Sequence, residues 1–448
     1  MNTIKEYGLK TPNILLPKDN GMLEKWPVIA CDQYTQDKLY WEKVNNFVDS
    51  APSTLRLILP EVYLDESSKE SRIEKIQLEM NKYLKSNVFN SPLSAMIYLE
   101  RKTAYNRIRK GLITCIDLDS YEWKPFSHAK IRATEATIVE RIPPRMKIRQ
   151  GASLESPHIM LLVNDPDKNL IEKTGELAKK ENKYLYNIDL MMKSGNISGW
   201  KVSNDNAEIE KNILAALATI KEKNTDDTNA PFMFAVGDGN HSLATAKAVW
   251  EDYKKKTGET EHPARYALVE IVNIYDNGLT FEPIHRVLYN VNNQALISFI
   301  QKKLNATIKE YKTANELEKI IKESIGFLGF VYIDANSRSH YICLETNITE
   351  LAISRLQPVI DMFLDQTKTN SATTVENTPS IDYIHGSDEV FRLGKEKNAL
   401  TILLPPIAKE SFFQTIAHLG PLPRKSFSMG EASEKRFYME CRKLFAQK

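Results

Sequence analysis

The sequence lacks the features that mark secreted, membrane-spanning and disulfide-stabilised proteins. Its 448 residues include four cysteines and no Cys-x-x-Cys pair, so the thiols are predicted to be reduced. The first residues contain no apolar core of a signal peptide, and no apolar run approaches the length of a membrane span. We therefore expect a cytoplasmic protein that does not enter a membrane. The cysteines are Cys31, Cys115, Cys343 and Cys441.

The sequence also lacks an excess of charge of either sign. Lys and Arg total 60 and Asp and Glu total 58, which leaves a formal net charge of +2. Proteins that coat nucleic acids or anionic membranes carry a large basic excess, so neither is an expected partner, although a local basic patch is compatible with this balance. There is no internal repeat and no low-complexity tract. The oligomeric state is left open.

Short apolar runs alternate with amphipathic helical stretches along the chain, which predicts a mixed α/β protein of the α+β class. At 448 residues the chain exceeds one ordinary core, so two or three domains are expected. An asparagine-rich stretch precedes a new helical pattern near residue 290, and we place a boundary there, giving domains 1–290 and 291–448. Expected elements include strands Leu55–Leu59 and Phe232–Val236, and helices Leu243–Lys256 and Ala432–Phe445.

The most informative stretch is a glycine-rich turn between an apolar strand and an amphipathic helix. Val236 ends the apolar run and Leu243 begins the helical pattern. A strand that passes through glycines into a helix leaves free backbone N–H groups at the helix start. Those groups, with the positive end of the helix dipole, suit an anion such as phosphate. The turn consists of Gly237, Asp238, Gly239, Asn240, His241 and Ser242.

Asp238 is unusual in such a turn because a carboxylate beside a phosphate is repulsive. It is compatible with a phosphate if a cation lies between them or if it accepts a substrate proton, so Asp238 is a candidate Mg²⁺ ligand or general base. Asn240 and Ser242 can cap the helix, and His241 can donate to an anion. The alternative is a tight turn without a ligand, in which the glycines serve geometry alone. The spacing matches neither a Walker A loop nor a dinucleotide-binding fingerprint.

A basic stretch between residues 130 and 149 is a second candidate for anion binding. It contains six Lys and Arg residues against two Glu residues, and Ile142-Pro-Pro-Arg145 favours a loop that presents guanidinium groups. Arginine matches phosphate oxygens in pairs, so Arg132 and Arg145 are candidate phosphate ligands. A solvated basic face is the alternative, and Arg132 can instead pair with Glu135.

Two shorter segments can add charged groups to a site built elsewhere. His285 and Arg286 follow a proline, and Lys425 and Ser426 follow two prolines that stiffen the chain. Each segment has a structural alternative: a histidine satisfied by backbone groups, and a basic surface turn. The eight histidines show no zinc-binding spacing.

Four motifs, in the same order along the chain, resemble DUF1015, a bacterial family of unknown function. They are Val236-Gly-Asp-Gly-Asn-His-Ser242, Ile131-Arg-Ala-Thr-Glu135, Pro283-Ile-His-Arg286 and Pro423-Arg-Lys-Ser426. The resemblance spans nearly the whole chain. It implies a ParB/sulfiredoxin-like core with an N-terminal elaboration in residues 1–290 and a smaller C-terminal α+β region in residues 291–448. The superfamily includes nucleotide-dependent partition proteins and a free-serine kinase.

The glycine turn departs from the family pattern at two positions. Many members carry Asp-Gly-His-His-Arg, whereas here Asn240 replaces the first histidine and Ser242 replaces the arginine. Loss of that arginine removes a bidentate phosphate contact unless one from residues 141–149 substitutes. The position of Asn240 holds the reactive cysteine in sulfiredoxins, and because asparagine has no thiolate, sulfinic-acid reduction by that route is excluded.

Together, the residues and the resemblance predict a site for a nucleotide or another small phosphorylated metabolite, with phosphoryl transfer or nucleotide hydrolysis as the chemistry. The expected cofactors are Mg²⁺ and a nucleoside phosphate. Two alternatives stay open: a metabolite-binding or scaffold protein without catalysis, and a ParB-like nucleic-acid-associated regulator. The candidate catalytic residues are Asp238, His241 and Glu135. The candidate phosphate-binding residues are Gly237, Gly239, Asn240, Ser242, Arg132, Arg145, His285, Arg286, Lys425 and Ser426.

Overall fold

The computed structural model of the chain contains two compact units. It describes residues 3–445 apart from 20, 204 and 371–377. The first unit comprises Met1–Thr280 and Met429–Lys448, and the second comprises Phe281–Ser428. The chain therefore leaves the first unit once and returns to it for its last residues. The two domains expected from the sequence, divided at residue 290, do not include this return of the chain to the first unit.

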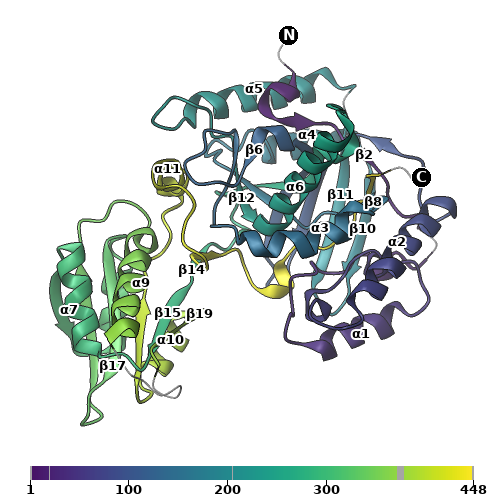
Figure 1. The fold of residues 1–448 in the computed structure, drawn as a ribbon. Coiled ribbons are helices and arrows are strands. Elements are labelled where there is room, and N and C mark those ends of the chain that lie inside the picture. The colour runs from purple at the N-terminus through teal and green to yellow at the C-terminus, as the bar shows by residue number, and fades with distance from the viewer. Residues whose placement is uncertain (1–2, 20, 204, 371–377, 446–448) are drawn as a thin grey trace. The chain divides into compact units, whose positions relative to one another are not determined.

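A mixed sheet of ten strands is the frame of the first unit (Figure 1). Its order is β10-β11-β4-β5-β13-β9-β12-β7-β6, and β1 pairs with β5. Neighbours from β10 to β13 are antiparallel, whereas β13 with β9, β12 with β7, and β7 with β6 are parallel. The bounds are β1 Leu9–Lys10, β4 Met96–Lys102, β5 Ile108–Asp117, β6 Tyr121–Glu122, β7 Ile131–Ala133, β9 Met160–Val163, β10 Tyr184–Leu190, β11 Gly195–Val202, β12 Phe234–Asp238 and β13 Tyr266–Asn273.

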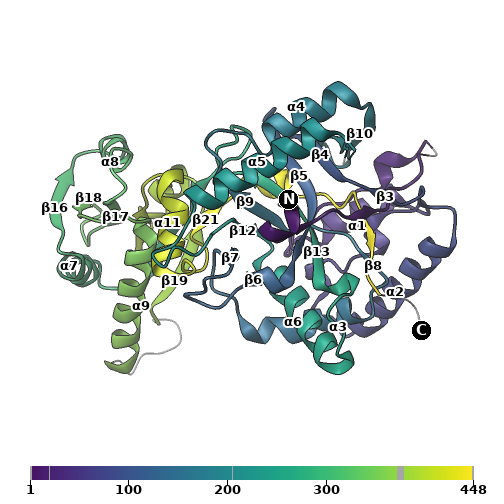
Figure 2. The same ribbon diagram turned by 90° about the horizontal axis from the view of Figure 1, so that it is seen from above.

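Two pairs of helices cover opposite faces of this sheet (Figure 2). Helix α4 packs on α5 on one face, and α3 packs on α6 on the other. In α6 the apolar residues Leu243, Ala246 and Trp250 are buried, as expected of a core-facing stripe. Helices α1 and α2 belong to the N-terminal part of the unit. The bounds are α1 Lys38–Val48, α2 Lys69–Lys85, α3 Ile142–Gln150, α4 Glu172–Glu181, α5 Ala207–Lys223 and α6 Asn240–Thr257.

The second unit is built on an antiparallel sheet of six strands in the order β16-β18-β17-β20-β15-β19. Helices α8 and α10 bury Leu317, Ile321 and Val390 against Val331 and Leu403 of the sheet. Helices α7 and α9 pack on each other. The bounds are β15 His285–Tyr289, α7 Asn293–Leu304, β16 Thr307–Tyr311, α8 Ala314–Ile321, β17 Phe327–Ile333, β18 Ser339–Glu345, α9 Ala352–Asn370, β19 Ser380–Ile384, α10 Ser387–Leu393, β20 Ala399–Leu403 and α11 Lys409–Leu419.

The α+β class predicted from the sequence is confirmed, because both units combine helices with sheets. Two local predictions are wrong. Leu55–Leu59, expected as a strand, contains part of the 3-10 helix η3 (Thr54–Arg56). Ile142-Pro-Pro-Arg145, expected as a loop, begins helix α3. Prolines are tolerated in a first helical turn because the N–H groups there have no intrahelical acceptor to lose. None of the helices in the described residues is long and apolar enough to cross a bilayer.

The segment Ala432–Phe445, expected as a helix, is also different in the structure. It contains the short 3-10 helix η9 (Ala432–Glu434) and then runs extended to β22 (Arg442–Lys443). The backbone of Cys441 exchanges two hydrogen bonds with Leu15, at 2.7 and 3.0 Å. Consecutive side chains between residues 436 and 442 are all buried, so tertiary packing decides the conformation of this segment rather than its local helical propensity. We call residues 429–445 the C-terminal strap.

Buried ionic groups hold the C-terminal strap against the central strands. Arg436, which is 1% exposed, pairs with Glu270 of β13 at 3.3 Å and also with Glu440. Glu270 receives a second cation, Arg109 of β5, at 3.3 Å. Tyr186 of β10 donates a hydrogen bond to Glu440. Since ions inside a protein are stable only when paired, each member of this group depends on the others.

We expect the Arg436→Met substitution to lower the free energy of unfolding by about 3–5 kcal/mol, because it leaves buried carboxylates without their cation. Urea unfolding followed by tryptophan fluorescence measures this, since all five tryptophans lie in the first unit. The matched control is Lys256→Met, which breaks an exposed pair with Asp252 in the same unit and should cost about 0–1 kcal/mol. Equal effects of the two substitutions would contradict the assigned role of Arg436.

Candidate functional site

The glycine turn connects β12 directly to α6. Gly239 has a φ of +85°, in the left-handed region, and a Cβ there would lie 3.0 Å from Ile159. A Cβ on Gly237 would lie 2.8 Å from the sulfur of Met429 and 2.9 Å from Leu162. Both glycines are therefore required: Gly239 by its backbone conformation and close packing, and Gly237 by close packing alone.

Two side chains of the first helical turn hold the neighbouring segment 134–138. Asn240 accepts the backbone N–H of Thr134 at 3.2 Å and donates to the carbonyl of Val236 at 3.3 Å. His241 Nε2 accepts the N–H of Ile138 at 3.3 Å. The N-cap residue of α6 is Gly239, which has no side chain to cap the helix. The positive end of this 18-residue helix lies beside the carboxylate of Asp238, which accepts the N–H of Gly239.

Ser242 faces a different group of residues. Its Oγ lies 3.0 Å from Nε2 of His158, and Nδ1 of His158 lies 2.8 Å from the hydroxyl of Tyr438. The same hydroxyl accepts the backbone N–H of Cys31 at 3.2 Å. Four segments far apart in the sequence thus meet in one hydrogen-bonded chain beside the start of α6.

The carboxylate of Asp238 is held by a lysine of the C-terminal strap. Lys435 Nζ lies 3.2 Å from Asp238 Oδ2, and the N–H of Gly239 donates to Oδ1 at 3.0 Å. Burial raises the pKa of Asp238, but the charges of Lys435 and His158 and the Gly239 N–H outweigh it, so the pKa lies below its ordinary value. The described residues contain no group of three or more His, Cys, Asp or Glu that could hold a metal ion. Mg²⁺ at Asp238 therefore stays a prediction.

A cavity of about 170 Å³ lies beside this chain, and we call it the α6 pocket. Ser242 and Thr245 of α6, His158 and Tyr438 line it together with Arg145 and Arg149 of α3. Since α3 packs on α6, the basic stretch and Ser242 of the glycine turn reach the same cavity, whereas Asp238 and His241 do not line it. The pocket thus joins hydroxyl, imidazole and guanidinium groups.

Each arginine of the α6 pocket has an acidic neighbour. Arg145 pairs with Glu61, and Arg149 Nη2 lies 2.6 Å from Glu155 Oε1. The buried Nε atom of Arg149 has no hydrogen-bond partner among the described residues. Buried donors of this kind are rare, and they can serve an anionic ligand.

Arg132 does not line the α6 pocket, contrary to the role expected for it. Its Nη2 lies 2.7 Å from Asp226, and its guanidinium carbon lies 4.6 Å from the ring centre of Phe232. The residue is 5% exposed, so it supports the connection that precedes β12. Glu135 lies in segment 134–138, which Asn240 and His241 attach to α6, and it does not line the α6 pocket either.

The other expected phosphate ligands belong to the second unit. Arg286 is fully buried and donates to Gln357 at 2.9 Å and to the carbonyl of Lys425 at 2.8 Å. His285 Nδ1 accepts the N–H of Leu404 at 3.0 Å, and burial with the charge of Arg286 lowers the pKa of His285 to about 4. Ser426 Oγ donates to the carbonyl of Pro423. These contacts give Arg286, His285 and Ser426 structural roles within that unit.

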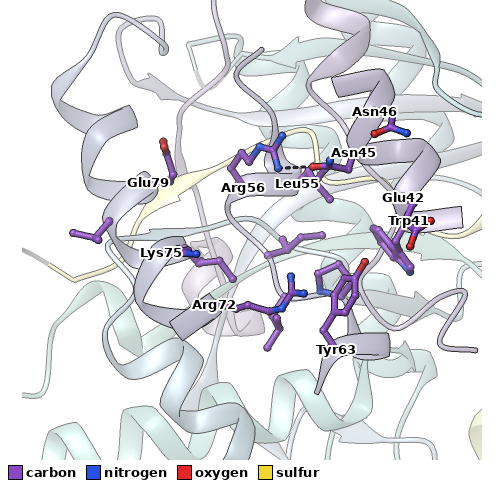
Figure 3. Close-up of a pocket in the computed structure, with 15 residues that line it drawn as sticks. Trp41, Glu42, Asn45, Asn46, Leu55, Arg56, Tyr63, Arg72, Lys75 and Glu79 are labelled. Carbon is purple, nitrogen blue, oxygen red and sulfur yellow. Dashed lines mark hydrogen bonds between the residues drawn. The ribbon is translucent and has the colours of Figure 1, made fainter. Parts of the chain in front are cut away.

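A larger cavity, of about 770 Å³, lies in the N-terminal part of the first unit (Figure 3). Side chains of α1 and α2 line it, and its wall shares Ile58 and Leu59 with the α6 pocket. Arg56 donates to Asn45 at 2.7 Å, and Arg72 pairs with Glu66 and lies over the ring of Tyr63. No residue of the glycine turn lines this cavity, so it is the weaker candidate for an anion.

The profile of a family described as "Protein of unknown function (DUF1015)" matches residues 15–374. The chain belongs to this family. No curated protein matches the sequence of this DUF1015 protein. The ParB/sulfiredoxin-like core that we expected stays a prediction.

Three solved structures show distant similarity to this DUF1015 protein. A conserved hypothetical protein from Pyrococcus furiosus has 10% identity and a TM-score of 0.35, with 71% of this chain and 90% of that chain covered. A free serine kinase variant in complex with AMP has 10% identity and a TM-score of 0.38, with 72% and 90% covered. SbnI with a C-terminal truncation, from Staphylococcus aureus, has 8% identity and a TM-score of 0.33, with 73% and 85% covered. Likeness of this degree supports no statement about activity.

Three residues of the candidate site in this DUF1015 protein were not among those expected from the sequence. His158 carried a usable signal, because it immediately precedes the apolar run Ile159–Val163, which is typical of a buried strand. Lys435 and Tyr438 carried none, because both lie in a segment whose pattern indicates a helix and whose extended path depends on distant partners.

The low pKa of His285 predicts acid sensitivity of the second unit. An unfolded histidine titrates near pH 6.5, so between about pH 6.5 and 4 the unfolded state binds the extra proton. The stability of the second unit should therefore fall by about 3 kcal/mol as the pH falls through this window. His285→Gln, which keeps an acceptor for Leu404 but cannot be protonated, should remove this dependence.

Hydrogen exchange of peptides from β15 and β20, corrected for intrinsic rates, measures the effect on the second unit. Peptides from β5 and β13 in the first unit serve as the internal reference. A wild-type pH dependence that survives in His285→Gln would contradict the assignment.

Proposed function

We propose that the α6 pocket binds the phosphate end of a small metabolite or nucleotide, and that the first unit transfers or hydrolyses the phosphoryl group. One observation carries this proposal: the first turn of a long helix contributes Ser242 to a cavity that Arg145 and Arg149 also line. Helix N-termini attract anions through their free N–H groups and dipole. Arginines add bidentate hydrogen bonds to phosphate oxygens.

The size of the α6 pocket supports a small ligand group. Cavities that enclose a drug-sized molecule measure about 300–1,000 Å³. The α6 pocket, at about 170 Å³, is smaller, which suits a phosphate with a few attached atoms rather than a whole nucleoside phosphate. If the ligand is a nucleotide, its base lies outside this cavity.

The charged groups around the α6 pocket support a binding mode in which a ligand anion replaces a carboxylate of the protein. Glu61 and Glu155 neutralise Arg145 and Arg149 in the absence of a ligand. A phosphate that enters competes with these carboxylates for the guanidinium groups, and the buried Nε of Arg149 is a further donor for it. Lys435 adds a further positive charge beside the glycine turn.

Asp238 is the candidate acid–base group of the proposed reaction. Its lowered pKa keeps it ionised at neutral pH, so it can accept a proton or, with Mg²⁺ bound, contribute an oxygen ligand. A binding protein without catalysis is the second candidate. It is favoured by the ion pair with Lys435, which gives the carboxylate a structural role. The ParB-like alternative has no supporting contact in the described part of the chain.

We expect inorganic phosphate or a nucleoside di- or triphosphate to raise the melting temperature, and Arg149→Met to weaken binding about 10- to 100-fold. The magnitude follows from a charged hydrogen bond of about 1.5–3 kcal/mol. Lys147→Met is the matched control, because Lys147 is an exposed cation on the same helix. Thermal shift and titration calorimetry with and without Mg²⁺ measure these effects. No shift with any of these ligands would contradict the proposal.

Asp238→Asn separates catalysis from binding. If Asp238 takes part in the reaction, phosphate release from a nucleotide or phosphomonoester should fall at least tenfold while the affinity for phosphate stays within a factor of about three. Unchanged turnover in Asp238→Asn would favour the binding protein and would contradict catalysis by Asp238.

A further inference from the structure

We propose that Ser242 is a nucleophile that takes up the phosphoryl group covalently, with His158 as its general base and Tyr438 as a positioning residue. The inference rests on the proposed function for the identity of the group transferred. The arrangement of a nucleophile, a base within hydrogen-bond reach and a third group that orients the base is typical of activated serines. In this chain the two distances are 3.0 and 2.8 Å.

Ser242 occupies a favourable position for a serine nucleophile. It is the third residue of α6 and half-buried, and its side chain lines the α6 pocket. The positive end of the helix dipole stabilises negative charge that develops on Oγ or on the attacked group. The pocket therefore places the hydroxyl where an anionic substrate is expected to bind.

The contacts of Tyr438 orient His158. Burial keeps the pKa of Tyr438 well above its ordinary value, so its hydroxyl retains the proton at neutral pH. The oxygen of this hydroxyl accepts the N–H of Cys31 and lies 2.8 Å from Nδ1 of His158. The proposed reaction uses the tautomer in which Nδ1–H donates to this oxygen and the Nε2 lone pair faces Ser242.

Other nucleophiles near the site are less suited to this chemistry. Burial and the charge of Asp32 hold the pKa of the Cys31 thiol far above neutrality, so Cys31 stays protonated. His241 uses its Nε2 to accept the N–H of Ile138. Among the groups considered, only Ser242 combines a base with access to the cavity.

The reaction balances with a phosphate monoester or a phosphoric anhydride as the donor. Ser242 Oγ attacks phosphorus and gives its proton to Nε2 of His158. The bond from phosphorus to the leaving oxygen breaks, and that oxygen departs with the electron pair and receives the proton from His158. A water or an acceptor hydroxyl then attacks the phosphoserine, passes its proton to His158, and Ser242 leaves and regains a proton.

The test uses the full-length protein and a fluorophosphonate, which forms a bond from serine Oγ to phosphorus with loss of fluoride. Peptide mass spectrometry should find the adduct on Ser242, and Ser242→Ala should abolish it. His158→Gln should slow the reaction about 10²-fold, since a general base contributes about 10²–10⁴-fold. Tyr438→Phe should lower the maximal rate about tenfold without changing the probe concentration at half-maximal rate, as expected of a positioning residue.

Ser411→Ala is the matched control. Ser411 is also the third residue of a helix, α11, but its hydroxyl donates to the carbonyl of Ala408 at 3.1 Å. It should neither form the adduct nor change the rate. Modification of Ser411, or of several serines at similar rates, would show that a helix N-terminus suffices and would overturn the proposal.

Two measurements separate this inference from the proposed function. Incubation of the wild type with p-nitrophenyl phosphate and a denaturing quench should trap phosphoserine at Ser242, and phosphate affinity is measured in parallel. Phosphate binding without any adduct at Ser242 overturns the nucleophile and leaves the binding function. A fluorophosphonate adduct at Ser242 without phosphate binding supports the nucleophile and contradicts the phosphate-binding function.

Discussion

The ion pair between Arg436 and Glu270 fixes the path of the C-terminal strap, and the candidate site depends on that path. Lys435 precedes Arg436 and reaches Asp238, and Tyr438 follows it by two residues and reaches His158. In an extended segment, side chains alternate in direction, so an anchored Arg436 also sets the directions of its neighbours. A group buried for stability thus positions Lys435 at the glycine turn and Tyr438 at the α6 pocket.

The second constraint is that two positions of the glycine turn, Gly237 and Gly239, carry no side chain. Gly237 lets Met429 and Leu162 pack against the end of β12, and Gly239 supplies the left-handed conformation from which α6 begins. The two glycines and the C-terminal strap therefore together determine the conformation of the glycine turn. Met429, the first residue of the C-terminal strap, packs against Gly237. Lys435, six residues later in the strap, pairs with Asp238 of the same turn.

Local features of the site were predictable from sequence, and long-range ones were not. The strand–glycine–helix pattern of residues 232–247 predicts the turn and α6 because its signals are local. The contribution of Arg145 to the same cavity as Ser242 follows from the packing of α3 on α6, and no spacing in the sequence reports that packing. Arg132 was expected to bind the ligand because nothing local in the sequence shows that its partner is Asp226, 94 residues further along the chain. The C-terminal strap was predicted as a helix because burial on both faces hides the two-residue period of an extended chain.

The order of the units along the chain has a consequence for biosynthesis. Residues 281–428 are translated before the C-terminal strap, which completes the first unit. On the ribosome, Glu270 and Asp238 therefore emerge long before Arg436 and Lys435, and during that interval Arg109 is the one cation of this group available to Glu270. The α6 pocket acquires Tyr438 only after the whole second unit has been translated.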